Sequence, residues 1–219
     1  MLESKVFSRT ETDDALISDS NYNLIIGAVL AWGFLVNWFM VGSIDPEYLR
    51  SINMFVFFIG YFVSCFFGIY LFTKSNKPLT SFIGYNFVVV PFGLIINMVV
   101  SQYDPEIVIE AIKVTAGVTL IMMCLGTIYP AFFKKIYGGL TIALLAVIVI
   151  ELVQVFVFGI HHNWLDWAVA AIFCGYIGYD WGRANQIPKT LDNAVDSAAV
   201  LYMDIINLFI RILRIMGRR

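Results

Sequence analysis

The C-terminal apolar segment reads Leu201-Tyr-Met-Asp-Ile-Ile-Asn-Leu-Phe-Ile-Arg-Ile-Leu-Arg-Ile-Met-Gly217, and it carries Asp204 near its start. The apolar segment before it, Cys174-Gly-Tyr-Ile-Gly-Tyr-Asp-Trp-Gly182, carries Asp180. A carboxylate in hydrocarbon is costly unless it is paired, hydrated or protonated. Two such residues on consecutive predicted helices indicate a shared proton or a bound cation.

The composition is that of a chain that crosses a membrane several times. Of the 219 residues, 60% are hydrophobic and 14% are charged, and the mean hydropathy is +0.81. Soluble domains carry about 25% charged residues. Because a transmembrane helix needs about 20 apolar residues, we predict an all-α membrane protein with seven transmembrane helices. They lie at approximately 23–44, 53–73, 79–102, 107–129, 137–159, 164–183 and 197–216.

The segments between the predicted spans are short and polar, such as Asp45-Pro46-Glu47 and Lys134-Lys135, and the longest runs from Ala184 to Asp196. None of them is long enough for a soluble domain. We therefore predict a polar N-terminal tail over residues 1–22 and a single transmembrane domain over 23–217.

Basic residues are distributed unequally between the two sides of this layout. With the N-terminus in the cytoplasm, eight of them fall on the inner side, whereas only Arg50 falls in an outer loop. The positive-inside rule favours this orientation, although it leaves Arg218 and Arg219 outside. The eight are Lys5, Arg9, Lys74, Lys77, Lys134, Lys135, Arg183 and Lys189.

Several function classes are excluded or disfavoured by the same composition. The net charge is -2 and no basic stripe suggests a nucleic-acid partner. The three cysteines lie inside apolar segments without metal-binding spacing. We expect the lipid bilayer as the main partner, no cofactor and no enzymatic chemistry.

Asp180 lies about one turn, and Asp204 about two turns, from the same end of their predicted helices. At similar depth on adjacent helices the two carboxyl groups would share one proton and titrate as a unit, which predicts a pH sensor. The alternative is that both residues only cap or hydrate helix ends. Gly178 and Gly182 bracket Asp180, and this spacing allows a neighbouring helix to approach closely.

Two further residues are candidate partners of the aspartates. Asn207 shares a helix face with Asp204 and is placed to hydrogen-bond to the pair. Lys74 ends the second predicted span at the same membrane level as the aspartates. It is either an ion-pair partner of Asp180 or a solvated basic residue.

We assign four polar side chains to a candidate cation pathway: Glu110, Glu151, Gln154 and Asn207. With Asp204 and Asp180 the two glutamates would form an acidic ladder, which favours cations, and oxygen ligands suit Ca²⁺. The alternatives are a pair between Glu110 and Lys113 and a structural hydrogen bond at Glu151.

Tyr179-Asp180 and the segment 201–217 resemble the C-terminal signature of the transmembrane Bax inhibitor motif family. Tyr85-Asn-Phe87, Val108-Ile-Glu-Ala111 and Leu125-Gly-Thr-Ile128 are similar to bacterial members of that family. The resemblance covers residues 74–217.

This resemblance implies seven helices, arranged as two three-helix layers around a central C-terminal helix. It implies a pH-regulated calcium leak channel in a bacterial plasma membrane, with calcium as the transported ion. The switch would be a hydrogen-bonded pair of Asp180 and Asp204, which would also contact calcium transiently. Lys74 takes the place of a basic residue that is arginine in bacterial relatives, and lysine lacks the bidentate fork.

Three other functions stay open. A cation/proton exchanger would use the same acidic ladder, and a non-conducting regulator of membrane proteins would need no pathway. An intramembrane aspartyl protease also carries two aspartates on consecutive helices, but residues 201–204 lack the Gly-x-Gly-Asp context of those enzymes. A retinal protein is excluded, because residues 197–216 contain no lysine.

Overall fold

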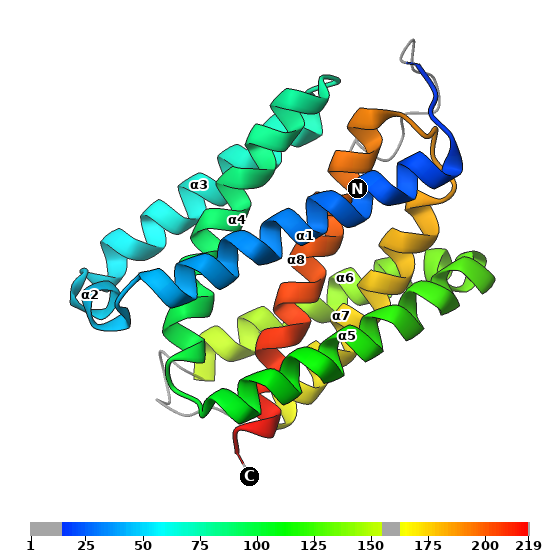
Figure 1. Ribbon diagram of the computed structural model, residues 1–219. Helices are drawn as coiled ribbons and strands as arrows, with labels where there is room; N and C mark the ends of the chain where they lie inside the picture. The colour runs from blue at the N-terminus through cyan, green and yellow to red at the C-terminus, as the bar shows by residue number, and fades with distance from the viewer. Residues whose placement is uncertain (1–14, 155–162, 219) are drawn as a thin grey trace. The chain divides into compact units, whose positions relative to one another are not determined.

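The computed structural model describes residues 15–154 and 163–218, and within these ranges it contains eight α-helices and no strand (Figure 1). The all-α prediction is therefore confirmed. The helices are α1 (Asp19–Ser43), α2 (Pro46–Ser51), α3 (Met54–Lys74), α4 (Pro78–Val100), α5 (Pro105–Ile128), α6 (Pro130–Val153), α7 (Asn163–Ala184) and α8 (Leu191–Met216).

Among the described helices, α1, α3, α4, α5 and α6 are long and apolar enough to cross a membrane. They correspond to the first five predicted spans, whereas crossing by α7 and α8 stays a prediction. Large apolar side chains such as Trp38, Phe55 and Ile142 are exposed on these five helices. Helices satisfy their own backbone hydrogen bonds in lipid, and lipid-facing side chains are apolar. The chain is an integral membrane protein.

Proline marks the start of four helices, at Pro46, Pro78, Pro105 and Pro130. Proline suits the first turn, because the N–H group that it lacks would have no partner within the helix there. Asn53 caps α3 by accepting hydrogen bonds from the N–H groups of Phe55 and Val56.

Two predicted connections are wrong, because the structure places them in helices. Asp45 caps the short helix α2, so that Pro46 and Glu47 are helical rather than part of a loop. Lys134 and Lys135 lie inside α6, whose start at Pro130 puts them in its first two turns with exposed side chains. Long basic side chains at a helix end can extend toward water.

The predicted connection from Ala184 to Asp196 is too long, because α8 begins at Leu191. The hydroxyl of Thr190 accepts a hydrogen bond from the N–H of Asn193 at 3.1 Å, which caps the helix. Asp192 lies in the first turn, where the helix dipole favours a carboxylate. The predicted span 137–159 extends beyond the described residues, and His161 and His162 lie outside them.

The chain divides into two compact units, with α8 contributing to both. Unit 1 contains the residues up to Gln102 together with Ala184–Tyr202, and unit 2 contains Tyr103–Arg183 and Met203–Arg219. The predicted polar tail over 1–22 and the single domain over 23–217 stay predictions, although α1 begins before residue 22.

In unit 1, α4 packs against α1 and α3 (Figure 1). Buried amides connect α1 to its neighbours: the amide of Asn37 donates to the carbonyl of Val89 at 3.1 Å, and its oxygen accepts from the hydroxyl of Tyr202 at 2.5 Å. Asn97 donates to the carbonyls of Met40 and Ile44. These bonds satisfy backbone and amide groups that are buried or partly buried.

Candidate functional site

Asp180 on α7 and Asp204 on α8 meet inside unit 2. Their residues are 6% and 7% exposed, and the two carboxyl groups hydrogen-bond to each other. The structure therefore brings together the two residues that the sequence singled out. Their role as a pH sensor stays a prediction.

The hydrogen bond between Asp180 and Asp204 requires that the pair carries a proton. An ionised carboxylate only accepts hydrogen bonds, so one of the two groups must carry the proton. No N–H or O–H group of the described residues donates to Oδ2 of Asp204, which is buried. A proton shared with Asp180 removes the charge that this oxygen would otherwise carry without a donor.

Aromatic side chains of α6 and α7 surround the pair. Tyr176 and Tyr179 interact electrostatically with Asp180, and the hydroxyl of Tyr176 donates to Thr141 at 3.1 Å. Tyr137 stacks on Tyr179, with ring centroids 4.1 Å apart. Arg183, one turn after Asp180, donates to the hydroxyl of Tyr179 and contributes a positive charge near Asp180.

Glycines position α7 against α5 beside Asp180. A Cβ atom added to Gly126 of α5 would collide with the carbonyl oxygen of Gly178, and one added to Gly182 would lie 2.7 Å from the carbonyl oxygen of Gly126. The prediction that the Gly178/Gly182 spacing admits a neighbouring helix is confirmed: α5 approaches at Gly182, and Phe133 of α6 packs against Gly178.

Asn207 and Lys74 were predicted as partners of the aspartate pair, and the structure places them differently. The amide of Asn207 donates to the carbonyl of Met203 at 2.8 Å, one turn earlier on its own helix. Lys74 is the last residue of α3 and has an exposed side chain. Its ion pair with Asp180 stays a prediction, because Lys74 belongs to unit 1 and Asp180 to unit 2.

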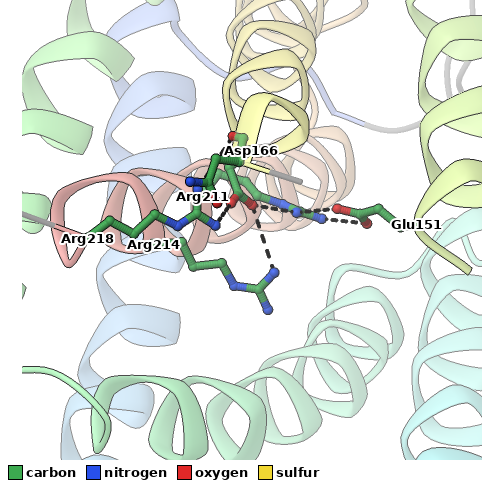
Figure 2. Close-up of polar contacts among 6 residues, drawn as sticks. Glu151, Asp166, Arg211, Arg214 and Arg218 are labelled. Carbon is green, nitrogen blue, oxygen red and sulfur yellow. Dashed lines mark hydrogen bonds and ion pairs between the residues drawn. The ribbon is translucent and has the colours of Figure 1, made fainter. Parts of the chain in front are cut away.

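Glu151, near the end of α6, lies in an ion network with the C-terminal end of α8 (Figure 2). Arg211 holds both oxygens of Glu151, at 2.5 and 2.9 Å, and also donates to Asp166 of α7 at 2.8 Å. Arg218 pairs with the other oxygen of Asp166. Asp166 is fully buried, so the network neutralises a carboxylate that would be costly to bury alone.

The remaining candidate residues of the cation pathway are less enclosed. Glu110 is exposed on α5, and Gln154 follows the end of α6. Among the described residues, no group of three or more His, Cys, Asp or Glu side chains is arranged to hold a metal ion. Ca²⁺ takes about six to eight oxygen ligands, which is more than two carboxyl groups supply, and calcium contact with the pair stays a prediction.

The sequence did not identify three residues of the ion network as site residues: Asp166, Arg211 and Arg218. Their partners lie 45 to 60 residues away along the chain, beyond any local spacing rule. One signal was available, because arginine inside an apolar helix requires an acidic partner.

Comparison with known proteins shows which family the chain resembles in sequence. Residues 19–219 match the family described as Inhibitor of apoptosis-promoting Bax1. The chain is 31% identical to Bax inhibitor 1 of Schizosaccharomyces pombe over 130 residues, which are 57% of this chain and 47% of the yeast protein. It therefore spans about half the length of that relative.

Two uncharacterized proteins of Helicobacter pylori, from strains 26695 and J99, are 30% and 32% identical over 167 and 170 residues. In each case the match covers 74% of this chain and 70% of the relative. The family match spans most of the sequence and includes both aspartates and the ion network. The chain belongs to the Inhibitor of apoptosis-promoting Bax1 family.

Proposed function

We propose that this protein is a leak channel for calcium and other cations, and that the Asp180–Asp204 pair is its pH-sensing gate. The observation that carries the proposal is the hydrogen bond between two buried carboxyl groups on α7 and α8. As part of the proposal, the protein lies in a bacterial plasma membrane with its N-terminus in the cytoplasm.

The proposed switch follows from the charge of the pair. With one shared proton the two groups attract, and without it two carboxylates face each other away from water. Two unit charges about 4 Å apart repel by about 4 kcal/mol at an effective dielectric constant of about 20. A difference of that size shifts a two-state equilibrium by about three orders of magnitude. Loss of the proton is therefore sufficient to change how α7 packs against α8 at the pair.

The proposed route for cations uses the polar side chains of unit 2. Glu110, Gln154 and Asn207 supply carboxylate and amide oxygens, to which the aspartate pair adds its own. Glu151 would meet a cation only after Arg211 released it, because Arg211 occupies both of its oxygens.

The test is Ca²⁺ entry into proteoliposomes between pH 6 and pH 8 for the wild type, Asp180→Asn and Asp204→Asn. The proposal predicts wild-type flux that depends on pH and a loss of that dependence in either variant. Asp104→Asn is the matched control, because Asp104 is exposed and its side chain makes no capping hydrogen bond to α5. Equal pH dependence in all four proteins would contradict the proposal.

A cation/proton exchanger is the second candidate, since the same buried proton would suit stoichiometric exchange. Under a Ca²⁺ gradient an exchanger acidifies or alkalinises the vesicle interior in proportion to the calcium moved. A leak channel moves calcium without that fixed proton countercurrent.

A further inference from the structure

Three arginines, two in the last turns of α8 and one just after its end, face two carboxylates. Arg211 and Arg214 lie three residues apart on one helix face, and Arg218 follows four residues later. Among the described residues, Glu151 and Asp166 are the acids that interact with this group. Counted over these five residues, the cluster carries one more positive than negative charge.

Arg214 is the arginine that the two acids leave least neutralised. Its one ion pair among the described residues is a 3.9 Å contact with Oδ1 of Asp166, which already accepts a hydrogen bond from Arg211. The described residues provide no hydrogen-bond acceptor for its guanidinium. Figure 2 shows this guanidinium apart from those of Arg211 and Arg218. Its side chain is 35% exposed and thus accessible to a ligand.

The aromatic residues around the cluster are Trp and Tyr, the types that are typical of a membrane–water interface. Trp164 and Trp167 flank Asp166 in the first turns of α7 and are 55% and 62% exposed. The ring of Tyr103 lies against Gly217, close to Arg214, with which it interacts electrostatically. Trp and Tyr are enriched where lipid headgroups meet the hydrocarbon. An arginine among such aromatic residues is expected to lie near lipid headgroups.

We propose that Arg214 binds the phosphate group of an anionic phospholipid. Guanidinium presents a planar fork of donors that matches phosphate oxygens, and its charge is weakly hydrated. Asp166 keeps Arg211 and Arg218 engaged within the protein, which leaves Arg214 as the donor directed to the lipid. The bound phosphate completes the charge balance of the cluster.

The experiment is native mass spectrometry of the full chain released from micelles that contain equal amounts of phosphatidylglycerol and phosphatidylcholine. The wild type is expected to retain phosphatidylglycerol preferentially. Arg214→Gln should reduce this preference about fivefold, the contribution of one basic residue near an anionic membrane surface. Arg50→Gln is the matched control, because it removes one arginine charge from α2, where Arg50 donates to Ser101 at 2.9 Å. It should reduce the preference less than Arg214→Gln does.

Arg214→Lys distinguishes bidentate recognition from charge alone, and it carries the test if Arg214→Gln does not fold. We expect lysine to lose part of the preference, because it offers a point charge without the fork. Inorganic phosphate added to the micelles identifies the source of the ligand. If inorganic phosphate displaces phosphatidylglycerol from the wild type but not from Arg214→Gln, the site recognises phosphate as such. If phosphatidylglycerol stays bound in excess inorganic phosphate, the site recognises the lipid.

Two results would overturn the proposal. One is that folded Arg214→Gln prefers phosphatidylglycerol as strongly as the wild type does. If Arg214→Gln is unfolded, the same result in Arg214→Lys counts instead. The other is an equal loss in Arg214→Gln and Arg50→Gln, which would show that only the net charge of the protein matters.

Discussion

Arg211 holds Glu151 through two parallel hydrogen bonds, from Nη1 to Oε1 at 2.5 Å and from Nη2 to Oε2 at 2.9 Å. This bidentate geometry is the strongest form of an arginine–carboxylate pair. It connects the end of α6 to α8 and leaves Nη1 to reach Asp166 of α7 as well. One side chain thus joins three helices of unit 2.

Arg211→Gln should destabilise the protein strongly. The substitution leaves Glu151 without its bidentate partner and weakens the neutralisation of Asp166, whose side chain is fully buried. Removing one partner of a buried ion pair costs about 3–5 kcal/mol. Thermal or denaturant unfolding in detergent measures the effect.

The double variant Arg211→Gln/Glu151→Gln provides the control for this prediction. Because both members of the pair are neutral, it should recover part of the lost stability. A single variant as stable as the wild type would show that the ion pair contributes nothing.

Gly126→Ala should destabilise unit 2, because the new Cβ atom would collide with the carbonyl of Gly178 and push α5 from α7. Overpacking of this kind costs about 1–3 kcal/mol. Gly117→Ala on the same helix is the matched control, since nothing lies within 4 Å of its added Cβ atom. Alanine there should be neutral or stabilising by up to about 1 kcal/mol. Equal melting temperatures for the two variants would contradict the close helix crossing.

Tyr202→Phe should destabilise unit 1 by about 1–3 kcal/mol, because it leaves the buried oxygen of Asn37 without its donor. Tyr48→Phe is a suitable control, since Tyr48 is 67% exposed. The comparison requires only unfolding midpoints in the same detergent. A loss of stability in Tyr48→Phe as large as in Tyr202→Phe would contradict the assignment.

Hydropathy predicted much of the fold, and the positions of the two aspartates along their helices predicted that they meet. The first five spans are long apolar stretches, for which burial in lipid dominates every local preference. Asp180 and Asp204 were predicted together because each lies near the same end of consecutive helices. The small-residue spacing around Asp180 predicted a close helix neighbour for the same local reason.

The sequence could not predict features that depend on distant partners. The charged residues Asp192 and Asp196 suggested a loop, but they lie in the first turns of α8, where Ser81 of α4 donates to Asp192 at 2.7 Å. The partner of Arg211 lies 60 residues earlier in the chain. Contacts of this kind follow from the packing of helices, which a single sequence does not display.

The most direct test of the gate combines both aspartate substitutions in one protein. If the pair acts as a unit through one shared proton, Asp180→Asn/Asp204→Asn should show the same flat pH profile of Ca²⁺ flux as either single variant. The measurement is Ca²⁺ entry into proteoliposomes between pH 6 and pH 8 for the wild type and all three variants. Flux that depends on pH is expected in the wild type alone. A double variant that retains the wild-type pH dependence would contradict it.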